Sequence, residues 1–312
     1  MADEPIEFFN RRNGRIERER IYGESWLRFI YGGNPLGRLS LSAVVRRAWF
    51  SAWYGWRMSR PDSVNRVLPF VVDYDLDAEE FAKPATAYRT FNEFFYRTLR
   101  PGARPISPGE DIAVFPADGR HLAYADVDTA DGFYVKGKKF TLAALLGSGG
   151  LGTRFAGGSL LISRLCPVDY HRFHFPVAGT PAESRLINGW LYSVSPLALR
   201  VNPGYLTENK RMVTLVDSPV FGEVAILEIG ATMVGAILQS FIPGRPVAKG
   251  DEKGLFAFGG SCVVTVFQRG RVRFDEDLIA NSAVHREVYA RMGERLGVAC
   301  TTASVKAGSP GA

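Results

Sequence analysis

Three short segments of the sequence carry side chains that could do nucleophilic or acid–base chemistry. The first contains His171 and His174, two of the four histidines, three residues apart. The second is a Pro-Ala-Asp-Gly stretch that includes Asp118, and the third is a Gly-Gly-Ser stretch in which Gly260 precedes Ser261. A serine, a histidine and a carboxylate are the groups of a nucleophilic triad, in which the histidine takes the hydroxyl proton and the carboxylate orients the histidine.

Each segment also has an ordinary structural explanation. Asp-Gly and Gly-Gly-Ser are turn signals. Residues at i and i+3 of a straight strand point to opposite faces, so both histidines reach one cleft only if the chain turns near them. Pro167 and Asp169 favour such a turn just before His171. Gly260 has no Cβ, so an oxygen nucleophile could approach its carbonyl closely.

Metal and disulfide chemistry are not expected from this sequence. The neighbouring histidines lack the third and fourth ligands that a zinc site needs. The cysteines, Cys166, Cys262 and Cys300, are odd in number and have no Cys-x-x-Cys spacing, which indicates a reducing compartment. The first residues, Met-Ala-Asp-Glu-Pro-Ile-Glu, are acidic and lack the features of a signal peptide.

Residues 1–105 are predicted to be a helical, basic and aromatic region that contacts a membrane. Residues 11–60 contain eleven Arg, no Lys and three Glu, hence a net charge of +8, and four of the five Trp lie between Trp26 and Trp56. Indole rings suit the polar boundary of a bilayer and guanidinium groups suit lipid phosphates. No run of about 18 uncharged apolar residues occurs, so we expect peripheral contact. The alternative is that these helices pack only on the protein's own core.

The remaining residues, 106–312, are predicted to form a mostly antiparallel β domain, a sandwich or an open barrel. Short β-branched or alternating runs are punctuated there by Gly and Pro. Just before it, Thr90 to Glu93 has the pattern of a capping box, and we expect Phe91, Phe94 and Phe95 to pack in a core. The predicted fold class is therefore α+β, with the helical region first.

Taken together, these segments resemble the phosphatidylserine decarboxylase proenzymes over nearly the whole chain, from about Tyr22 to Val298. The joint order and spacing of the matching segments are much more specific than any one of them. These segments are Thr90–Pro105, Pro116–Gly119, Val135–Leu142, Asp169–His174, Val201–Pro203, Gly230–Gly235, Lys249–Gly250, Gly259–Ser261 and Met292–Glu294.

The resemblance implies a chain that cuts itself and converts a serine into a covalent pyruvoyl group. The cut is expected between Gly260 and Ser261, which gives a larger piece of residues 1–260 and a smaller piece of residues 261–312. The residue that follows Ser261 is Cys262, where many bacterial members have Thr, and we expect it to pack as a small apolar residue.

The resemblance also implies the roles of four side chains. Asp118, His174 and Ser261 would form the self-cleavage triad, and the pyruvoyl group made from Ser261 would then form a Schiff base with the substrate amine. That group withdraws electrons as CO2 is lost, the task that pyridoxal phosphate performs elsewhere, so neither pyridoxal phosphate nor a metal is expected. His171 matches the histidine that handles the substrate and transfers a proton.

The expected reaction is the conversion of phosphatidylserine to phosphatidylethanolamine and CO2. The basic, Trp-rich segment favours this lipid substrate, and the main alternative is pyruvoyl-dependent decarboxylation of a soluble amino acid. An uncut serine hydrolase and a scaffold without catalysis are further alternatives. The expected partners are an anionic membrane containing phosphatidylserine, on the cytoplasmic face of the cell membrane, and the two pieces of the chain itself as a heterodimer that could pair further. No nucleic-acid partner is expected.

Overall fold

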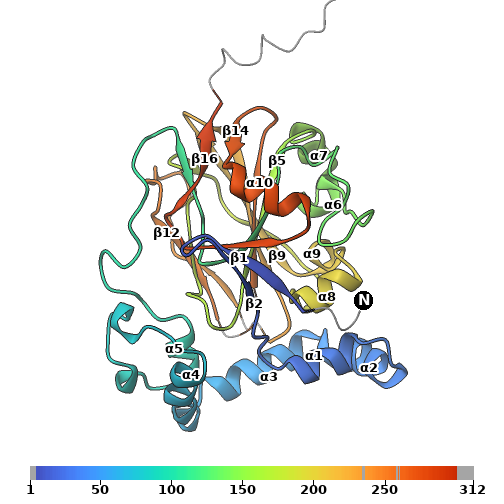
Figure 1. The fold of residues 1–312 in the computed structure, drawn as a ribbon, viewed down its shortest axis with the longest axis vertical. Helices are drawn as coiled ribbons and strands as arrows, with labels where there is room; N and C mark the ends of the chain where they lie inside the picture. Colours follow the sequence, from blue (N-terminus) through green and yellow to red (C-terminus); the bar gives the residue numbers. More distant parts are fainter. Residues whose placement is uncertain (1–4, 234–235, 258, 260, 301–312) are drawn as a thin grey trace, which may run out of the picture.

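The helices of the first hundred residues gather at one end of the molecule, below the strands in Figure 1. The computed structural model describes residues 5–233, 236–257, 259 and 261–300. The α-helices of this layer are α1 (Glu24–Tyr31), α2 (Pro35–Ser40), α3 (Ala48–Met58), α4 (Val67–Asp73) and α5 (Phe91–Phe95). Shorter π- or 3-10-helical turns lie at Leu41–Val45, Pro61–Arg66, Ala78–Glu80 and Ala85–Ala87. The later α-helices are α6 (Leu142–Leu146), α7 (Gly149–Arg154), α8 (Pro196–Val201), α9 (Tyr205–Glu208) and α10 (Glu276–Ala283).

The strands begin before this helical layer and continue after it. The described strands are β1 (Glu7–Asn10), β2 (Arg15–Arg18), β3 (Ile112–Val114), β4 (Gly119–Tyr124), β5 (Ser159–Leu165), β6 (Arg172–His174), β7 (Thr180–Pro181), β8 (Arg185–Ile187), β9 (Arg211–Ser218), β10 (Gly222–Gly230), β11 (Ile237–Gln239), β12 (Glu252–Phe256), β13 (Ser261–Phe267), β14 (Val272–Phe274), β15 (Glu287–Ala290) and β16 (Arg295–Ala299).

Among the described residues, a ten-stranded sheet forms the body of the molecule. Its order is β2-β1-β15-β4-β5-β13-β10-β9-β7, and β8 also pairs with β9. Strand β13 lies between β5 and β10 near the middle, and it is apolar and buried along its whole length except for the side chains of Ser261 and Thr265, which are buried but polar. Such a continuous buried run is typical of a strand that is covered on both faces.

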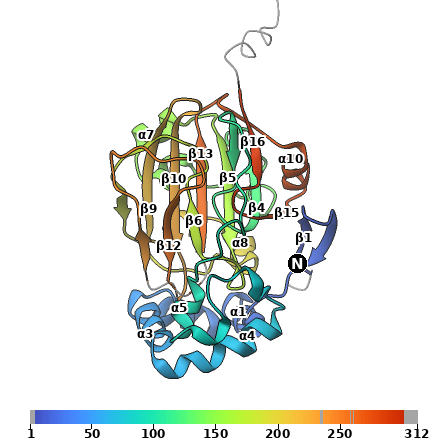
Figure 2. The same cartoon turned by 90° about the vertical axis from the view of Figure 1, so that its left-hand side faces the viewer.

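Two three-stranded sheets, β11-β12-β6 and β14-β16-β3, complete the β region. Phe173 on β6 and Phe256 on β12 join the same apolar core as the central strand β13, so the first small sheet packs against the large one (Figure 2). Named strands pair antiparallel throughout, apart from the parallel pair β1 and β15. The prediction of helices followed by mostly antiparallel β structure is confirmed, and the described strands form open sheets.

The prediction of a helical region from the start of the chain is wrong for residues 7–18, which form a β-hairpin. Strand β1 pairs with β2 across a turn that contains Asn13 and Gly14, and Gly14 has φ +69°, which favours glycine. The physical reason is a tertiary contact, because β1 also pairs with β15, which begins 277 residues after the end of β1. A local sequence pattern does not reveal a pairing over that distance.

The capping box is confirmed at the start of α5. The backbone N–H of Glu93 donates to Thr90 Oγ1 at 3.1 Å, so the hydroxyl satisfies one of the free donors of the first turn. Phe91, Phe94 and Phe95 are buried, as predicted, in a second core cluster within the helical layer. Val168, after β5, and Met233, after β10, pack against this cluster and connect it to the β region.

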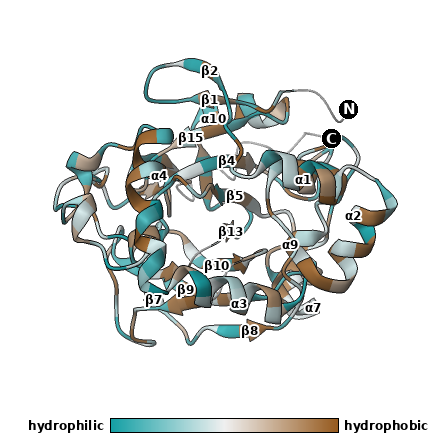
Figure 3. Ribbon diagram, turned by 90° about the horizontal axis from the view of Figure 1, so that it is seen from below, coloured by the Kyte–Doolittle hydropathy of each residue, from teal (hydrophilic) through white to brown (hydrophobic). Residues whose placement is uncertain are grey.

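The outer face of the helical layer exposes large apolar side chains. They are Phe29, Leu36, Leu39, Trp49, Trp53, Trp56, Leu68 and Val72, each close to half exposed or more. Figure 3 looks onto this layer and shows hydrophobic segments at α2, whereas α3 is mostly pale on this hydropathy scale. None of the helices within the described ranges is long and apolar enough to cross a membrane. An apolar face of this kind on a surface layer marks a contact site with a partner or a bilayer.

Candidate active site

Ser261 is the first residue of the central strand β13. Its backbone pairs with Leu165 on β5 and with Gly230 on β10, so the strands on both sides fix its position. The side chain is fully buried, and its hydroxyl has no hydrogen-bond partner among the described residues. A buried hydroxyl without a partner costs about 1–3 kcal/mol, and such groups concentrate where function requires them. The preceding residue, Gly260, lies outside the described residues.

His171 lies just before β6, beside the chain that leads to Ser261. Its Nδ1 is 3.1 Å from the carbonyl oxygen of Asp169, and its ring packs on Phe95 with the centroids 3.8 Å apart. Burial lowers the pKa of His171 to about 3, although the adjacent backbones of Asp169 and Gly259 act in the opposite direction. The imidazole is therefore neutral near pH 7, in reach of the segment before Ser261.

His174 ends β6 and has a defined tautomer. Its Nδ1 is 2.9 Å from the carbonyl oxygen of Gly250, which can only accept, so Nδ1 carries the proton and donates. Nε2 is 3.3 Å from the hydroxyl of Tyr170, whose ring stacks on the imidazole. Burial lowers the pKa of His174, so this histidine too is neutral, with its basic lone pair on Nε2.

Asp118, immediately before β4, is held by other groups than His174. Arg104 Nε lies 2.9 Å from both carboxylate oxygens, and the backbone N–H of Met292 donates to Oδ1 at 2.8 Å. The negative charge of Asp118 nevertheless raises the pKa of His174, against the larger effect of burial. The described hydrogen bonds therefore do not join Asp118, His174 and Ser261, and the triad role of these residues stays a prediction.

The turn before His171, predicted from Pro167 and Asp169, is present. The backbone N–H of Asp169 donates to the carbonyl of Cys166 at 2.9 Å, and the carboxylate of Asp169 accepts from the backbone N–H of Cys166 at 2.6 Å. Arg120 on β4 forms an ion pair with the same carboxylate at 2.7 Å. This turn places His171 and the strand that bears His174 next to each other.

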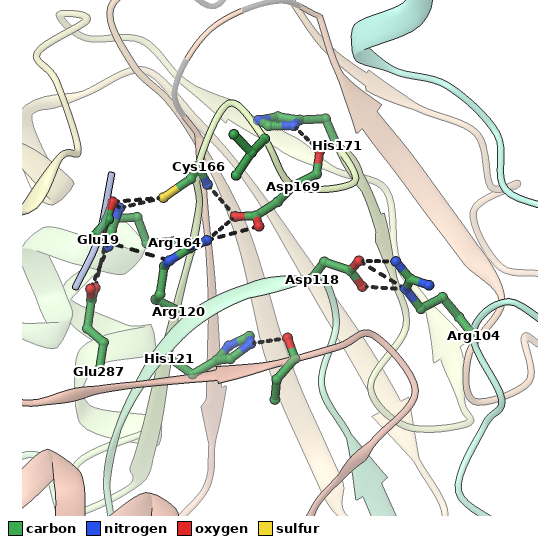
Figure 4. Close-up of polar contacts among 12 residues, drawn as sticks. Glu19, Arg104, Asp118, Arg120, His121, Arg164, Cys166, Asp169, His171 and Glu287 are labelled. Carbon is green, nitrogen blue, oxygen red and sulfur yellow. Dashed lines mark hydrogen bonds and ion pairs between the residues drawn. The ribbon is translucent and has the colours of Figure 1, made fainter. Parts of the chain in front are cut away.

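A buried charge network lies behind this turn, and sequence reasoning missed it (Figure 4). Arg164 on β5 binds Glu19 at 2.6 Å and Glu287 on β15 at 2.5 Å, and the Cys166 thiol donates to Glu19. Arg164 is the cross-strand neighbour of Cys262 on β13. Its partners lie more than 100 residues away along the chain, so no spacing pattern could have revealed them.

A cavity of about 270 Å³ opens between the helical layer and the end of the central strands. Gly259 is part of its wall, which places the cavity beside the segment before Ser261. Its other walls come from β5 and the turn after it, from the loops around Ser193 and Thr232, and from the helical layer. These walls are mainly apolar. The helical side contributes Tyr22, Trp26, Leu27 and Tyr54.

The structure also bears on the packing of Cys262 and on the arrangement of possible metal ligands. Cys262 is fully buried in the main core and burial raises the pKa of its thiol, so the prediction that it packs as a small apolar residue is confirmed. Among the described residues, no group of three or more His, Cys, Asp or Glu side chains is arranged as metal ligands would be.

The fold and the site are typical of an enzyme. They combine a buried serine whose hydroxyl has no hydrogen-bond partner among the described residues, two buried histidines with lowered pKa, and a cavity lined by Gly259. The family model of phosphatidylserine decarboxylase matches residues 91–298. A phosphatidylserine decarboxylase proenzyme of Fusobacterium nucleatum is 43% identical over 297 residues, which cover 95% of this chain and 99% of that protein. The proenzyme of Chlamydia trachomatis serovar L2 is 45% identical over 95% of this chain and 98% of its own length. That of Desulfitobacterium hafniense strain Y51 is 39% identical over 94% and 98%.

The chain belongs to the phosphatidylserine decarboxylase family. Its activity is accordingly that of a carboxy-lyase of phospholipid biosynthesis, and the family's members are made as proenzymes. This confirms the resemblance stated from the sequence, and it sets aside the uncut serine hydrolase and the inactive scaffold.

Proposed function

We propose that the chain cuts itself between Gly260 and Ser261 and that the new end of the smaller piece carries the pyruvoyl group that decarboxylates phosphatidylserine. The observation that carries this proposal is the position of Ser261. It combines complete burial, a hydroxyl that has no partner in the part of the chain that the structure describes, and a backbone held on both sides by β5 and β10. Because the strands on both sides hold its backbone, the hydroxyl of Ser261 stays close to the carbonyl of the preceding residue. This proximity favours its attack on that carbonyl.

The cut proceeds through an ester. Ser261 Oγ attacks the carbonyl carbon of Gly260 while a base takes the hydroxyl proton, and the peptide nitrogen leaves as the amine of Ser261. Removal of the α-proton of Ser261 then expels the Gly260 carboxylate, and the remaining dehydroalanine takes up water and releases ammonia. We assign the first proton transfer to His174, whose Nε2 carries the free lone pair once the Tyr170 hydroxyl turns away.

Asp118 is proposed to support that base electrostatically. Its charge favours the protonated imidazole of His174. In this structure the carboxylate forms an ion pair with Arg104 in place of a direct contact with the histidine. The carbonyl of Gly250 already fixes the tautomer of His174, so the carboxylate is needed for the charge of the imidazolium rather than for orientation.

The residues around the cut suit a pyruvoyl group. Its parent Ser261 lies in a buried site beside a mainly apolar cavity, which excludes water from a reactive carbonyl. When present, the group supplies an electron-withdrawing carbonyl that stabilises the carbanion left by the loss of CO2. His171, neutral and adjacent to Gly259, is the proposed donor of the proton that the former α-carbon then takes up.

The substrate is proposed to enter from a bilayer. The cavity beside Gly259 is walled on one side by Trp26, Leu27 and Tyr54 of the helical layer, whose outer face carries the exposed apolar side chains. A lipid headgroup that reaches the cavity therefore leaves its acyl chains at that face. The net positive charge of residues 11–60 favours an anionic surface, and we place the protein as a peripheral protein on the cytoplasmic face of the cell membrane.

The cut is tested by intact mass and a denaturing gel of the purified protein. We expect two pieces with the junction at Gly260 and Ser261, and a smaller piece whose N-terminus is blocked. Ser261→Ala should give one uncut chain that releases no CO2 from phosphatidylserine vesicles.

Two matched variants serve as controls for this experiment. Ser159→Ala alters a different buried serine, which lies on β5. Cys262→Ala removes the thiol of the residue that follows Ser261. Both should be cut as the wild type is. A Ser261→Ala chain that still splits would show that the site is assigned to the wrong residue.

A further inference from the structure

A second buried charged cluster lies between the two sheets that carry the proposed reacting groups. Lys253 on β12 and Glu228 on β10 form an ion pair with Nζ 2.8 Å from Oε1, and neither side chain is exposed at all. Gln239 on β11 closes the cluster, because it donates to Glu228 at 2.6 Å and accepts from Lys253 at 2.8 Å. Two side chains of the small sheet thus hold one carboxylate of the large sheet.

A gain in stability does not account for this buried ion pair, because burying the two charges costs free energy. Ions are costly to remove from water, and apolar replacements of a buried ion pair are often neutral or stabilising. Phe173, Phe175 and Phe241 surround the ammonium group of Lys253, with ring centroids 5.0–6.0 Å away, so the surroundings would accept an apolar chain. The cluster therefore fits a role in specifying geometry.

The cluster joins the two strands that neighbour the reacting residues. Lys253 follows Glu252, which is the cross-strand partner of His174. Glu228 lies two residues before Gly230, which is the cross-strand partner of Ser261. The ion pair therefore connects the strand paired with β6, which bears His174, to the strand paired with β13, which bears Ser261 (Figure 2).

We propose that Lys253, Glu228 and Gln239 are positioning residues that hold the histidine-bearing sheet in register with Ser261, and that self-cleavage depends on them more than folding does. This inference rests on the proposed function, in which Ser261 is the residue that is cut. None of the three side chains touches the reacting atoms; they act through the strands that carry them.

The test replaces the cluster and measures cutting and stability separately. Lys253→Met combined with Glu228→Leu removes both charges together and leaves no uncompensated ion. We expect this double variant to keep a melting temperature close to that of the wild type and to be cut at least tenfold more slowly in a time course after cell-free synthesis. The exchanged pair, Lys253→Glu with Glu228→Lys, should be cut faster than the double apolar variant, because it restores an ion pair between the two strands. If slow cutting came only from a general loss of packing, the exchanged pair would not recover the cutting rate.

A matched control uses an exposed ion pair on the same strand. Glu223 on β10 binds Arg154 at 2.8 Å and lies at the end of β10 far from Gly230. Arg154→Met with Glu223→Leu should leave the cutting rate unchanged.

The outcomes separate this inference from the proposal beneath it. A Lys253→Met/Glu228→Leu chain that folds and is cut at the wild-type rate overturns the inference. If that chain does not fold, Gln239→Leu decides the question, because it keeps the ion pair: slower cutting supports the inference and an unchanged rate overturns it. Ser261→Ala is followed in parallel, and a cut in that variant would instead refute the proposed function.

Discussion

Arg104 holds the carboxylate of Asp118 on both oxygens, with Nε 2.9 Å from each and Nη2 2.6 Å from Oδ2. The two side chains are almost completely buried, and Arg104 also binds Glu80, which in turn binds Arg291. The backbone N–H of Met292 completes the shell of Asp118. The predicted catalytic carboxylate is thus embedded in a structural network that links both sides of the proposed cut.

The first prediction concerns the stability of this pair. Arg104→Met leaves a buried carboxylate without its counter-charge, so we expect the free energy of unfolding to fall by about 3 kcal/mol or more. Arg104→Met combined with Asp118→Leu should cost less than Arg104→Met alone. Urea unfolding in the uncut Ser261→Ala chain measures both. Arg60→Met, which breaks the exposed pair with Asp62, is the control and should change stability by less than about 1 kcal/mol.

The second prediction separates the two histidines. His174→Asn should slow self-cleavage at least 100-fold, since a positioned general base contributes about 10²–10⁴-fold. His171→Asn should still be cut, and its release of CO2 from phosphatidylserine should fall by a similar factor. A gel and a CO2 assay on the same preparations measure both steps. The reverse pattern, with the His171 variant uncut and the His174 variant cut, would exchange the two assigned roles.

The third prediction concerns the apolar face of the helical layer. Replacing Trp49, Trp53 and Trp56 by Ser removes three indoles that are each about half exposed, so binding to vesicles that contain phosphatidylserine should weaken at least tenfold. Self-cleavage should be unchanged, because it needs no bilayer. Vesicle flotation measures the first effect and a denaturing gel the second.

A matched control for the vesicle experiment lies on the β region. Leu186 on β8 and Val284 at the end of α10 are exposed to a similar degree and lie outside helices α1–α5. Serine at both positions should leave vesicle binding as it is. Equal losses in the two sets of variants would argue against the helical layer as the membrane contact.

The fourth prediction is a loss of stability in acid. Burial lowers the pKa of both His121 and His171 to about 3, below the value of about 6.5 in an unfolded chain. Below pH 6.5 the unfolded state therefore binds more protons than the folded state, and stability falls as the pH drops toward 3. Each histidine should cost about 2 kcal/mol between pH 7 and pH 5.

This acid effect is measured by urea unfolding at several pH values in the Ser261→Ala chain. His121 lies outside the proposed reaction, bonded to Ser163 and to the carbonyl of Ala290, so His121→Gln provides a test that leaves the site intact. That variant should lose less stability in acid than its parent, by about 2 kcal/mol between pH 7 and pH 5. An unchanged pH slope would mean that His121 is not buried in its neutral form.

Local signals predicted the local structure well. The capping box at Thr90, the apolar packing of Phe94 and the turn before His171 each depend on residues within four positions of one another, and each is present. The candidate site residues were also found in short motifs. Their chemistry needs particular side-chain types, serine, histidine and aspartate, which can be recognised in the sequence.

The parts that the sequence did not predict depend on contacts between distant segments. The hairpin of residues 7–18 is stabilised by β15, and Arg164 meets Glu19 and Glu287 across 145 and 123 positions. Periodicity and spacing describe one element at a time, so they do not identify which charged side chains will be buried together. Spacing also did not predict that Asp118 is held by Arg104 and by the backbone N–H of Met292, while no described hydrogen bond joins it to His174.

The place of β13 in the middle of the large sheet has a consequence for the life of the mature protein. The proposed cut before Ser261 would leave this sheet built from two polypeptides, and the shorter one would supply two of its strands, β13 and β15. Reassembly after denaturation then becomes a bimolecular reaction that competes with aggregation of the exposed β5 and β10. The uncut form should renature readily, whereas the working enzyme should be long-lived yet unable to recover once it has come apart.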